Sequence, residues 1–246
     1  MKNKIRGEFI LKFLIVGDVC GRPGREAFRK YVPELKKEHN IDVVVVNGEN
    51  IAGGRGISRK TLDEIYRAGA DIVTSGNHIW DQKEIVSFID DEPFLIRPAN
   101  YPEGAPGKGY CIYPFKAKNI GVINVSGRTF MPPMDCPFQK VDEILKEIKN
   151  QCDIILVDIH AEATSEKIAM GFYLDGKVTC VVGTHTHVQT ADNRILPKGT
   201  AYISDLGMVG PYNSSLGINV NNAIDKFITC RPVRFEMAEG PNIFSA

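Results

Sequence analysis

The chain has 246 residues, of which 43% are hydrophobic and 24% are charged, a composition typical of a globular protein. Thirty basic residues balance thirty acidic residues, so no net field attracts a long nucleic-acid tract or an anionic membrane. A small nucleotide bound in a local pocket remains compatible with this balance.

Residues 1–10 are interpreted as an N-terminal extension. The apolar run after the basic start is interrupted by Glu8 and Lys12, and no cleavage site follows, so it does not predict a signal peptide. No other stretch is apolar and long enough to span a membrane. The six cysteines form no Cys-x-x-Cys pair, which predicts free thiols. We therefore expect a cytoplasmic protein in which residues 11–246 form a single domain.

Short β-branched runs alternate with amphipathic segments along the chain. The predicted strands are 12–16, 42–47, 71–75, 119–125, 153–159, 178–183, 201–206 and 232–237. The predicted helices are 24–39, 58–68, 81–89 and 138–150, and the Pro- and Gly-rich residues 97–110 predict a loop. The alternation predicts an α/β fold with a largely parallel sheet at its start. From residue 178 on, strands without clear helices between them indicate a second or mixed sheet.

Polar side chains follow the ends of five predicted strands. They are Asp18, Glu49 with Asn50, Asn77 with His78, His160, and His185 with His187. Singly, each has a structural explanation, since a strand-end aspartate commonly caps a turn and a lone histidine is commonly a satisfied, half-buried residue. Because sites in open α/β sheets form outside the carboxyl ends of strands, we expect these side chains to converge.

The residue types in this set indicate a metal site. Imidazoles, carboxylates and amide oxygens without a thiolate cluster suit borderline ions. Seven candidate ligands exceed what one tetrahedral ion needs and fit two ions that share a carboxylate, an arrangement used in phosphoester hydrolysis. We expect two divalent or trivalent ions per chain, Fe or Mn in the first place and Mg or Zn as alternatives.

Several motifs resemble those of the calcineurin-like metallophosphoesterases in order and spacing: "GD" at 17–18, "NGEN" at 47–50, "GNH" at 76–78 and "GTHTH" at 183–187. Longer stretches, such as "GDVCGRPGR", "DIHAEATSEK" and "SDLGMVGPY", are similar to the YmdB-like branch of that superfamily. The resemblance extends from about residue 11 to the C-terminus. It implies two facing mixed β-sheets flanked by α-helices, a four-layer αββα sandwich with metals at the strand ends.

The resemblance also implies a role for each matching residue. The positions that hold one metal are matched by Asp18, Glu49, Asn50 and His187. Those that hold the second are matched by Glu49, Asn77, His160 and His185, with Glu49 bridging. His78 matches the general acid. The implied activity is a phosphodiesterase acting on cyclic nucleotides, with 2′,3′-cyclic nucleotides the favoured substrates and a metal-bridging hydroxide as nucleophile.

Two residues keep more than one interpretation. The common Asp-x-His motif of the superfamily is Asp18-Val-Cys20 here, and Cys20 is either a small buried residue or a sulfur close to the first metal. Asp81 either orients the ring of His78 or caps a helix.

If the segment around His185 and His187 is extended, both side chains point to the same side.

Candidate substrate contacts lie in two glycine-containing loops. Arg55 in "AGGRG" (52–56) and Arg128 with Phe130 in "SGRTF" (126–130) either contact phosphate and base or belong to ordinary surface loops. The expected partner is a small cyclic nucleotide or a phosphodiester at an RNA end, and a homo-oligomer is compatible with the sequence. The alternatives are a phosphomonoesterase or nucleotidase, and a non-catalytic regulatory protein that retains the fold.

Overall fold

The computed structural model describes residues 10–246, so residues 1–9 of the predicted extension lie outside the described residues. The strands are β1 Phe13–Val16, β2 Asp18–Val19, β3 Val43–Asn47, β4 Ile72–Thr74, β5 Tyr110–Phe115, β6 Lys118–Ser126, β7 Ile154–His160, β8 Cys180–Thr184, β9 Arg194–Ile195, β10 Ala201–Ile203, β11 Met208–Pro211 and β12 Asn242–Phe244. The helices are α1 Gly21–His39, α2 Arg59–Arg67, α3 Pro137–Ile148, α4 Thr164–Leu174 and α5 Val220–Thr229. Across residues 10–246, every helix is too short or too polar to cross a membrane.

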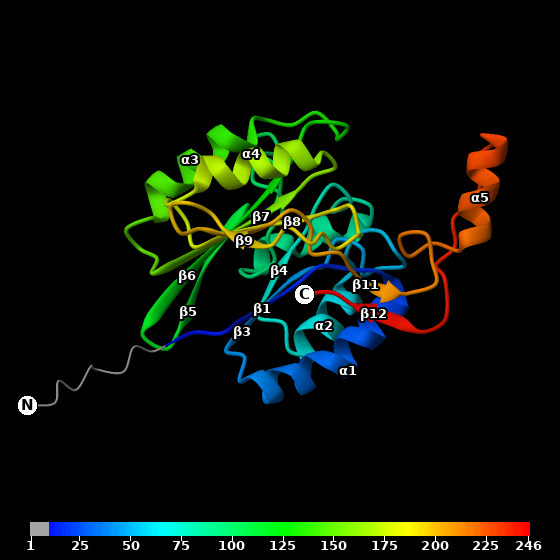
Figure 1. Cartoon of the computed structure of the whole chain (residues 1–246), viewed down its shortest axis with the longest axis horizontal. Helices are drawn as coiled ribbons and strands as arrows, with labels where there is room; N and C mark the ends of the chain where they lie inside the picture. Colours follow the sequence, from blue (N-terminus) through cyan, green and yellow to red (C-terminus); the bar gives the residue numbers. More distant parts are fainter. Residues whose placement is uncertain (1–9) are drawn as a thin grey trace, which may run out of the picture.

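The strands form three hydrogen-bonded sheets (Figure 1). The first has the order β1-β3-β4 and is parallel throughout. The second has the order β5-β6-β7-β8-β10-β9, with a parallel centre and antiparallel strands at both edges. The third, β12-β11-β2, extends the first because β1 continues across Gly17 into β2. A Cβ at Gly17 would lie 2.0 Å from the Gly207 carbonyl oxygen, so this junction requires glycine.

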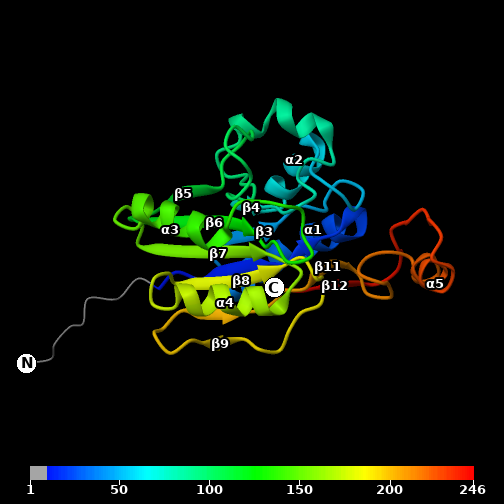
Figure 2. The same cartoon turned by 90° about the horizontal axis from the view of Figure 1, so that it is seen from above.

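The first two sheets pack face to face, and their side chains alternate as strand geometry requires. Val43 and Val45 of β3 belong to one apolar cluster together with Val122 of β6 and Leu156 of β7. Val44 and Val46 of the same strand belong to a different cluster on the opposite face. The shared cluster therefore forms the inner layer between the sheets, which lie one over the other in Figure 2.

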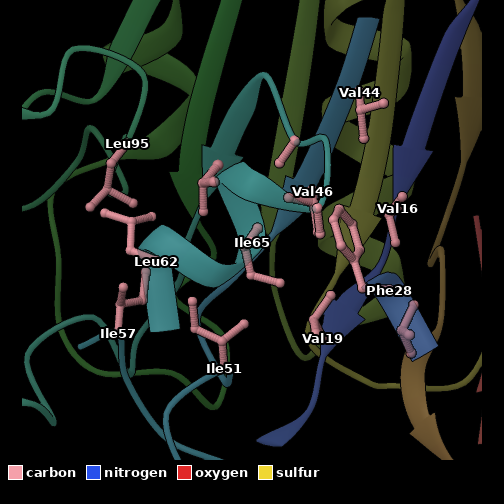
Figure 3. Packing of buried hydrophobic residues seen from close by; sticks show 14 of the residues in the cluster. Val16, Val19, Phe28, Val44, Val46, Ile51, Ile57, Leu62, Ile65 and Leu95 are labelled. Carbon is pink, nitrogen blue, oxygen red and sulfur yellow. The ribbon is translucent and has the colours of Figure 1, made fainter. Parts of the chain in front are cut away.

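Helices cover the outer face of each sheet. Phe28 of α1 and Leu62 and Ile65 of α2 pack against the outer side of β3, as Figure 3 shows. On the far side, Val141 of α3 and Met170 of α4 pack against β6, β7 and β8. The four-layer arrangement of helix, sheet, sheet and helix confirms the predicted fold class.

Three expectations about local structure were wrong. The predicted helix 81–89 is a pair of 3₁₀ turns, Lys83–Ser87 and Ile89–Asp91, in which Phe88 N–H donates to the carbonyl of Ile85, three residues back. The predicted strand 232–237 makes only one bridge, between Met237 and Ile218, and most of its residues are exposed. The region after residue 178 does contain a helix, α5, which extends away from the sheets in Figure 1.

Candidate metal centre

The residues predicted at strand ends converge at one edge of the sandwich. Asp18 lies in β2, Glu49 follows β3, Asn77 follows β4, His160 ends β7, and His185 follows β8. Parallel strands carry their carboxyl ends to the same edge, which is why residues far apart in sequence meet here. A cleft of about 280 Å³ opens at this edge, and five of the eight predicted residues line it: Glu49, Asn50, His78, His185 and His187. His160 contacts His185 from beneath the cleft.

The ligand-type atoms form two groups with one common member. Glu49, His160 and His185 each offer one atom within 4.8 Å of the others, and so do Asp18, Glu49 and His187. Glu49 belongs to both groups, and its side chain is 1% exposed. The carboxylate of Glu49 is therefore placed to join two neighbouring cations.

Contacts on both oxygens hold the Glu49 carboxylate in position. Its Oε1 accepts a hydrogen bond from Asn50 Nδ2 at 3.0 Å and lies 3.2 Å from His160 Nε2. Its Oε2 accepts from the backbone N–H of His78 at 3.2 Å. The backbone N–H of Glu49 donates to Asn47 Oδ1 at 3.1 Å. These bonds hold the Glu49 side chain in one orientation.

The tautomer of His160 is set by a hydrogen-bond chain beneath it. Thr184 Oγ1 donates its only proton to Asp158 Oδ1 at 2.8 Å, so it must accept from His160 Nδ1, which is 2.9 Å away. Strand pairing aligns His160 with Thr184 between β7 and β8. The proton on Nδ1 leaves Nε2 as the nitrogen that faces Asn77 Oδ1 at 3.1 Å and His185 Nδ1 at 3.0 Å.

His185 and His187 lie in a tight turn and not in an extended segment, so their side chains need not point to the same side. Both have left-handed backbone conformations, with φ of 97° and 64°. Such conformations are uncommon for residues other than glycine and store strain that the surroundings must offset. The turn points the two side chains to different places: His185 contacts His160, whereas His187 lies beside Asp18 and Asn50.

A buried ion pair supports this turn from below. Asp205 Oδ2 accepts from both the backbone N–H and the hydroxyl of Thr186, at 3.0 Å and 2.6 Å. The same oxygen lies 2.6 Å from Lys167 Nζ, whose side chain is 2% exposed. The backbone N–H of His185 donates to Asp18 Oδ2 at 3.0 Å. These bonds offset the strain of the two left-handed histidines.

The second group is completed by a ring of contacts around His187. Its Nδ1 donates to the Leu216 carbonyl at 3.1 Å, which leaves Nε2 facing Asp18 Oδ1 at 3.9 Å and the Asn50 amide at 3.2 Å. Rotating the Asn50 side-chain amide by a half-turn would point its oxygen, instead of its nitrogen, toward His187 Nε2. Cys20 Sγ is buried and lies 3.7 Å and 3.9 Å from the two ring nitrogens. The sulfur thus packs on His187, close to the group but at van der Waals distance.

Burial and neighbouring charges shift the ionisation of three of these side chains. Burial raises the pKa of Asp18 to about 6. Burial also opposes ionisation of Glu49, but His160 outweighs it and the pKa of Glu49 falls to about 2. Burial lowers the pKa of His185 to about 3. His185 is therefore neutral at physiological pH, as an imidazole ligand must be.

Three features indicate that cations fit here. Asp18 Oδ1 is fully buried and, within residues 10–246, has no hydrogen-bond partner. His160 Nε2 faces acceptor atoms of Glu49 and Asn77, whose lone pairs a shared cation satisfies together. A Cβ at Gly76 would lie 2.2 Å from His160 Nε2 and 2.3 Å from Glu49 Oε2, so glycine leaves open space beside both atoms. The donor set of nitrogen and oxygen atoms suits Mn, Fe or Zn.

His78 stands beside the two groups without belonging to either. Its Nδ1 lies 2.9 Å from Asp81 Oδ2, and its side chain is 25% exposed at the cleft. The carboxylate accepts the Nδ1 proton, so Nε2 is the nitrogen left to exchange a proton with a ligand. Of the two interpretations of Asp81, the structure supports orientation of His78, because Asp81 contacts its ring and the 3₁₀ turn that follows has Gln82, not Asp81, at its N-cap position.

The predicted substrate contacts separate into two sets. Arg55 is exposed and lines the cleft. Arg128 and Phe130 do not line it: the backbone N–H of Arg128 donates to Glu166 Oε1 at 3.0 Å, and the Phe130 side chain is 90% exposed. A carboxylate that the sequence interpretation did not include, Glu162, lies 3.2 Å from His185 Nε2. Its position two residues after His160 was the available signal.

A further wall of the cleft comes from residues near the C-terminus, a set that the sequence did not reveal. Leu216, Ile218 and Met237 form this C-terminal rim. The bridge between Ile218 and Met237 holds the rim together. The Met237 side chain lies against Gly21 and Gly54, where an added Cβ would come within 3.0 Å and 2.6 Å of it. Gly54 therefore leaves space for the Met237 side chain, which covers the loop that follows Glu49.

Comparison with known proteins gives relatives over most of the chain. The family model described as YmdB-like protein matches residues 14–246. A 2′,3′-cyclic-nucleotide 2′-phosphodiesterase from Bacillus subtilis (strain 168) is 53% identical over 235 residues, which are 96% of this chain and 89% of that protein.

Solved structures agree with this match. A hypothetical protein from Thermus thermophilus superposes with a TM-score of 0.90 at 43% identity, covering 94% of this chain and 90% of that one. A novel phosphatase from Mycoplasma pneumoniae superposes with a TM-score of 0.88 at 37% identity, covering 93% and 83%. The fold, the metal-binding groups and the matched length agree, and the chain belongs to the YmdB-like family.

Proposed function

We propose that the chain is a metal-dependent phosphodiesterase that hydrolyses cyclic nucleotides, with 2′,3′-cyclic nucleotides as the preferred substrates. The observation that carries this proposal is the pair of ligand groups joined by Glu49, with His78 at their side. The Bacillus subtilis relative, 53% identical, is a 2′,3′-cyclic-nucleotide 2′-phosphodiesterase. A non-catalytic protein would have no need for an imidazole held by a carboxylate beside a metal centre.

Two ions would be held by separate residues around Glu49. We assign Asp18, Asn50 and His187 to the first ion, and Asn77, His160 and His185 to the second. Fe or Mn is the expected metal, with Mg or Zn as alternatives. When bound, such ions supply Lewis acidity to the phosphoryl oxygens and activate the attacking water.

The remaining steps belong to side chains of the cleft. In its protonated form, His78, held through Nδ1 by Asp81, would donate its Nε2 proton to the ribose oxygen that leaves phosphorus. Arg55 provides a guanidinium at the cleft wall for a non-bridging phosphate oxygen. The Glu49 carboxylate is held through Oε2 by the backbone N–H of His78, a contact that does not depend on the Asn50 amide.

The test is a metal analysis combined with a substrate panel. We expect two metal ions per chain and turnover of 2′,3′-cyclic nucleotides ahead of 3′,5′-cyclic nucleotides and bis(p-nitrophenyl) phosphate. Nucleoside monophosphates are the monoester comparison. Preference for the monoesters would replace the proposal with a nucleotidase. If protein loaded with Mn, Fe, Mg or Zn hydrolyses none of these substrates, the result would favour the alternative of a non-catalytic regulatory protein.

A further inference from the structure

A second basic feature lies outside the metal centre, in a groove of about 480 Å³ between α1 and α2. Both helices run away from the cleft and lie side by side in Figures 1 and 2. Arg22, Arg25 and Arg29 of α1 are spaced by three and four residues, and Lys60 and Arg67 of α2 by seven, so each set lies on one helix face. We call this feature the basic groove.

The basic groove concentrates positive charge in a chain whose total charge is balanced. Its five cations face only two carboxylates, Glu26 and Glu64. Glu64 is engaged by Arg25, whose Nε lies 2.6 Å from Glu64 Oε2, and Glu26 lies 3.5 Å from Arg22 Nε. The other three cations of the groove, Arg29, Lys60 and Arg67, pair with neither of these two carboxylates.

These three cations are exposed. Within residues 10–246, Arg29 and Lys60 have neither a salt bridge nor a side-chain hydrogen bond. Arg67 has one partner, Asp63 of its own helix, at 3.6 Å with both side chains exposed. Exposed pairs of this kind contribute little free energy and exchange readily for another anion.

The near end of the basic groove joins the segment that carries the metal ligands. Arg25 donates to the Ile51 carbonyl, and the backbone N–H of Gly21 donates to the Asn50 carbonyl at 2.9 Å. The loop that follows Glu49 and contains Arg55 leads directly into α2. From Arg22 to Arg29 the α1 face extends about 10 Å at 1.5 Å per residue. Arg55 of the cleft and Lys60 of the basic groove are thus close in sequence, on the loop and the helix that join the two sites.

We propose that the basic groove binds the phosphodiester backbone of a short RNA whose 2′,3′-cyclic phosphate end occupies the cleft. This inference rests on the proposed function and, of the two partners expected from the sequence, selects RNA ends and assigns the rest of the strand to the basic groove. The cyclic phosphate forms from the 2′-hydroxyl of a 3′-terminal nucleotide, so the rest of the strand continues on its 5′ side. The residues lining the groove include no aromatic side chain, so recognition is through phosphates and independent of base sequence.

The test varies the length of the RNA substrate and the charge of the basic groove in one assay. Substrates are a nucleoside 2′,3′-cyclic monophosphate and a tetraribonucleotide with the same cyclic end. We expect a lower KM for the tetranucleotide, with an advantage that shrinks as salt rises, because single-strand binding falls with a log–log slope of about −0.7 for each phosphate contact. The double variant R29E/R67E should raise the tetranucleotide KM roughly tenfold and leave the mononucleotide KM unchanged.

The matched control is K30E/K37E, which reverses two charges of α1 that do not line the basic groove. Circular dichroism checks that both variants fold. Equal effects of the two double variants, or no advantage of the tetranucleotide, would overturn the proposal.

A binding measurement separates this proposal from the proposed function. Fluorescence anisotropy of a labelled hexaribonucleotide with a 3′-phosphate needs no turnover. Weaker binding by R29E/R67E than by K30E/K37E supports the groove even if no cyclic phosphate is hydrolysed. Identical binding by the two variants refutes it even if mononucleotides are good substrates.

Discussion

The floor and the rim of the cleft are built in different ways. The floor, represented by Asp18, Glu49 and His160, is buried and consists of residues at the ends of parallel strands. The C-terminal rim, Leu216, Ile218 and Met237, is joined by one backbone bridge and is partly exposed. The floor thus has fixed geometry suited to metals, whereas the rim is an apolar cover that can adapt to the bound group.

This difference predicts that substitutions in the floor abolish activity and that substitutions in the rim change affinity. Four variants, ordered from the largest expected effect to the smallest, test the comparison.

Glu49→Gln should have the largest effect. The amide keeps the size of the side chain but removes the charge that both ligand groups share. We expect metal content to fall from two ions per chain to fewer than one and phosphodiesterase activity to fall below detection. Elemental analysis and the cyclic-nucleotide assay measure both. Retention of two ions would show that Glu49 does not join the groups.

His78→Ala should separate catalysis from metal binding. The ring touches Asp81 and not the two ligand groups, so we expect both ions to be retained. Loss of a general acid commonly lowers kcat by about 100- to 10,000-fold. Metal content and kcat are measured on the same preparation. A metal-free or fully active variant would contradict the role assigned to His78.

Thr184→Val tests the support beneath the floor. Valine keeps the shape but leaves His160 Nδ1 and Asp158 without their shared partner. We expect metal affinity to fall about 10- to 100-fold, and the free energy of unfolding to fall by about 1–3 kcal/mol. Metal titration and denaturant unfolding give the two values. Thr184→Ser, which restores the hydroxyl, should recover both, and failure to do so would assign the effect to packing.

Met237→Ala should have the smallest effect, because the side chain is only partly buried in the rim. We expect KM to rise about threefold with kcat unchanged, since much less apolar area is lost than in a fully buried methionine. Steady-state kinetics measure both constants. A large fall in kcat would place the rim within the catalytic machinery and end the distinction between floor and rim.

The sequence predicted the floor because each of its residues follows a strongly apolar strand, and parallel strands bring their ends together without further information. It did not predict Thr184 as the partner of His160, because that contact depends on the register between β7 and β8. It also missed the left-handed turn at His185 and His187, where no glycine marks the positive φ values. That turn is supported by the Asp205–Lys167 pair, whose two residues are distant in the sequence and meet only in the folded protein.

The third sheet has a consequence for the order in which the centre is completed during synthesis. Asp18 is the first proposed ligand to leave the ribosome, yet β2 pairs only with β11, Met208–Pro211, which is made about 190 residues later. The backbone N–H of Gly17, beside Asp18, donates to the Ser245 carbonyl at 3.2 Å. In a nascent chain the β2–β11 pair beside Asp18 therefore cannot form until Met208–Pro211 has been translated, so this side of the proposed centre is completed late in synthesis.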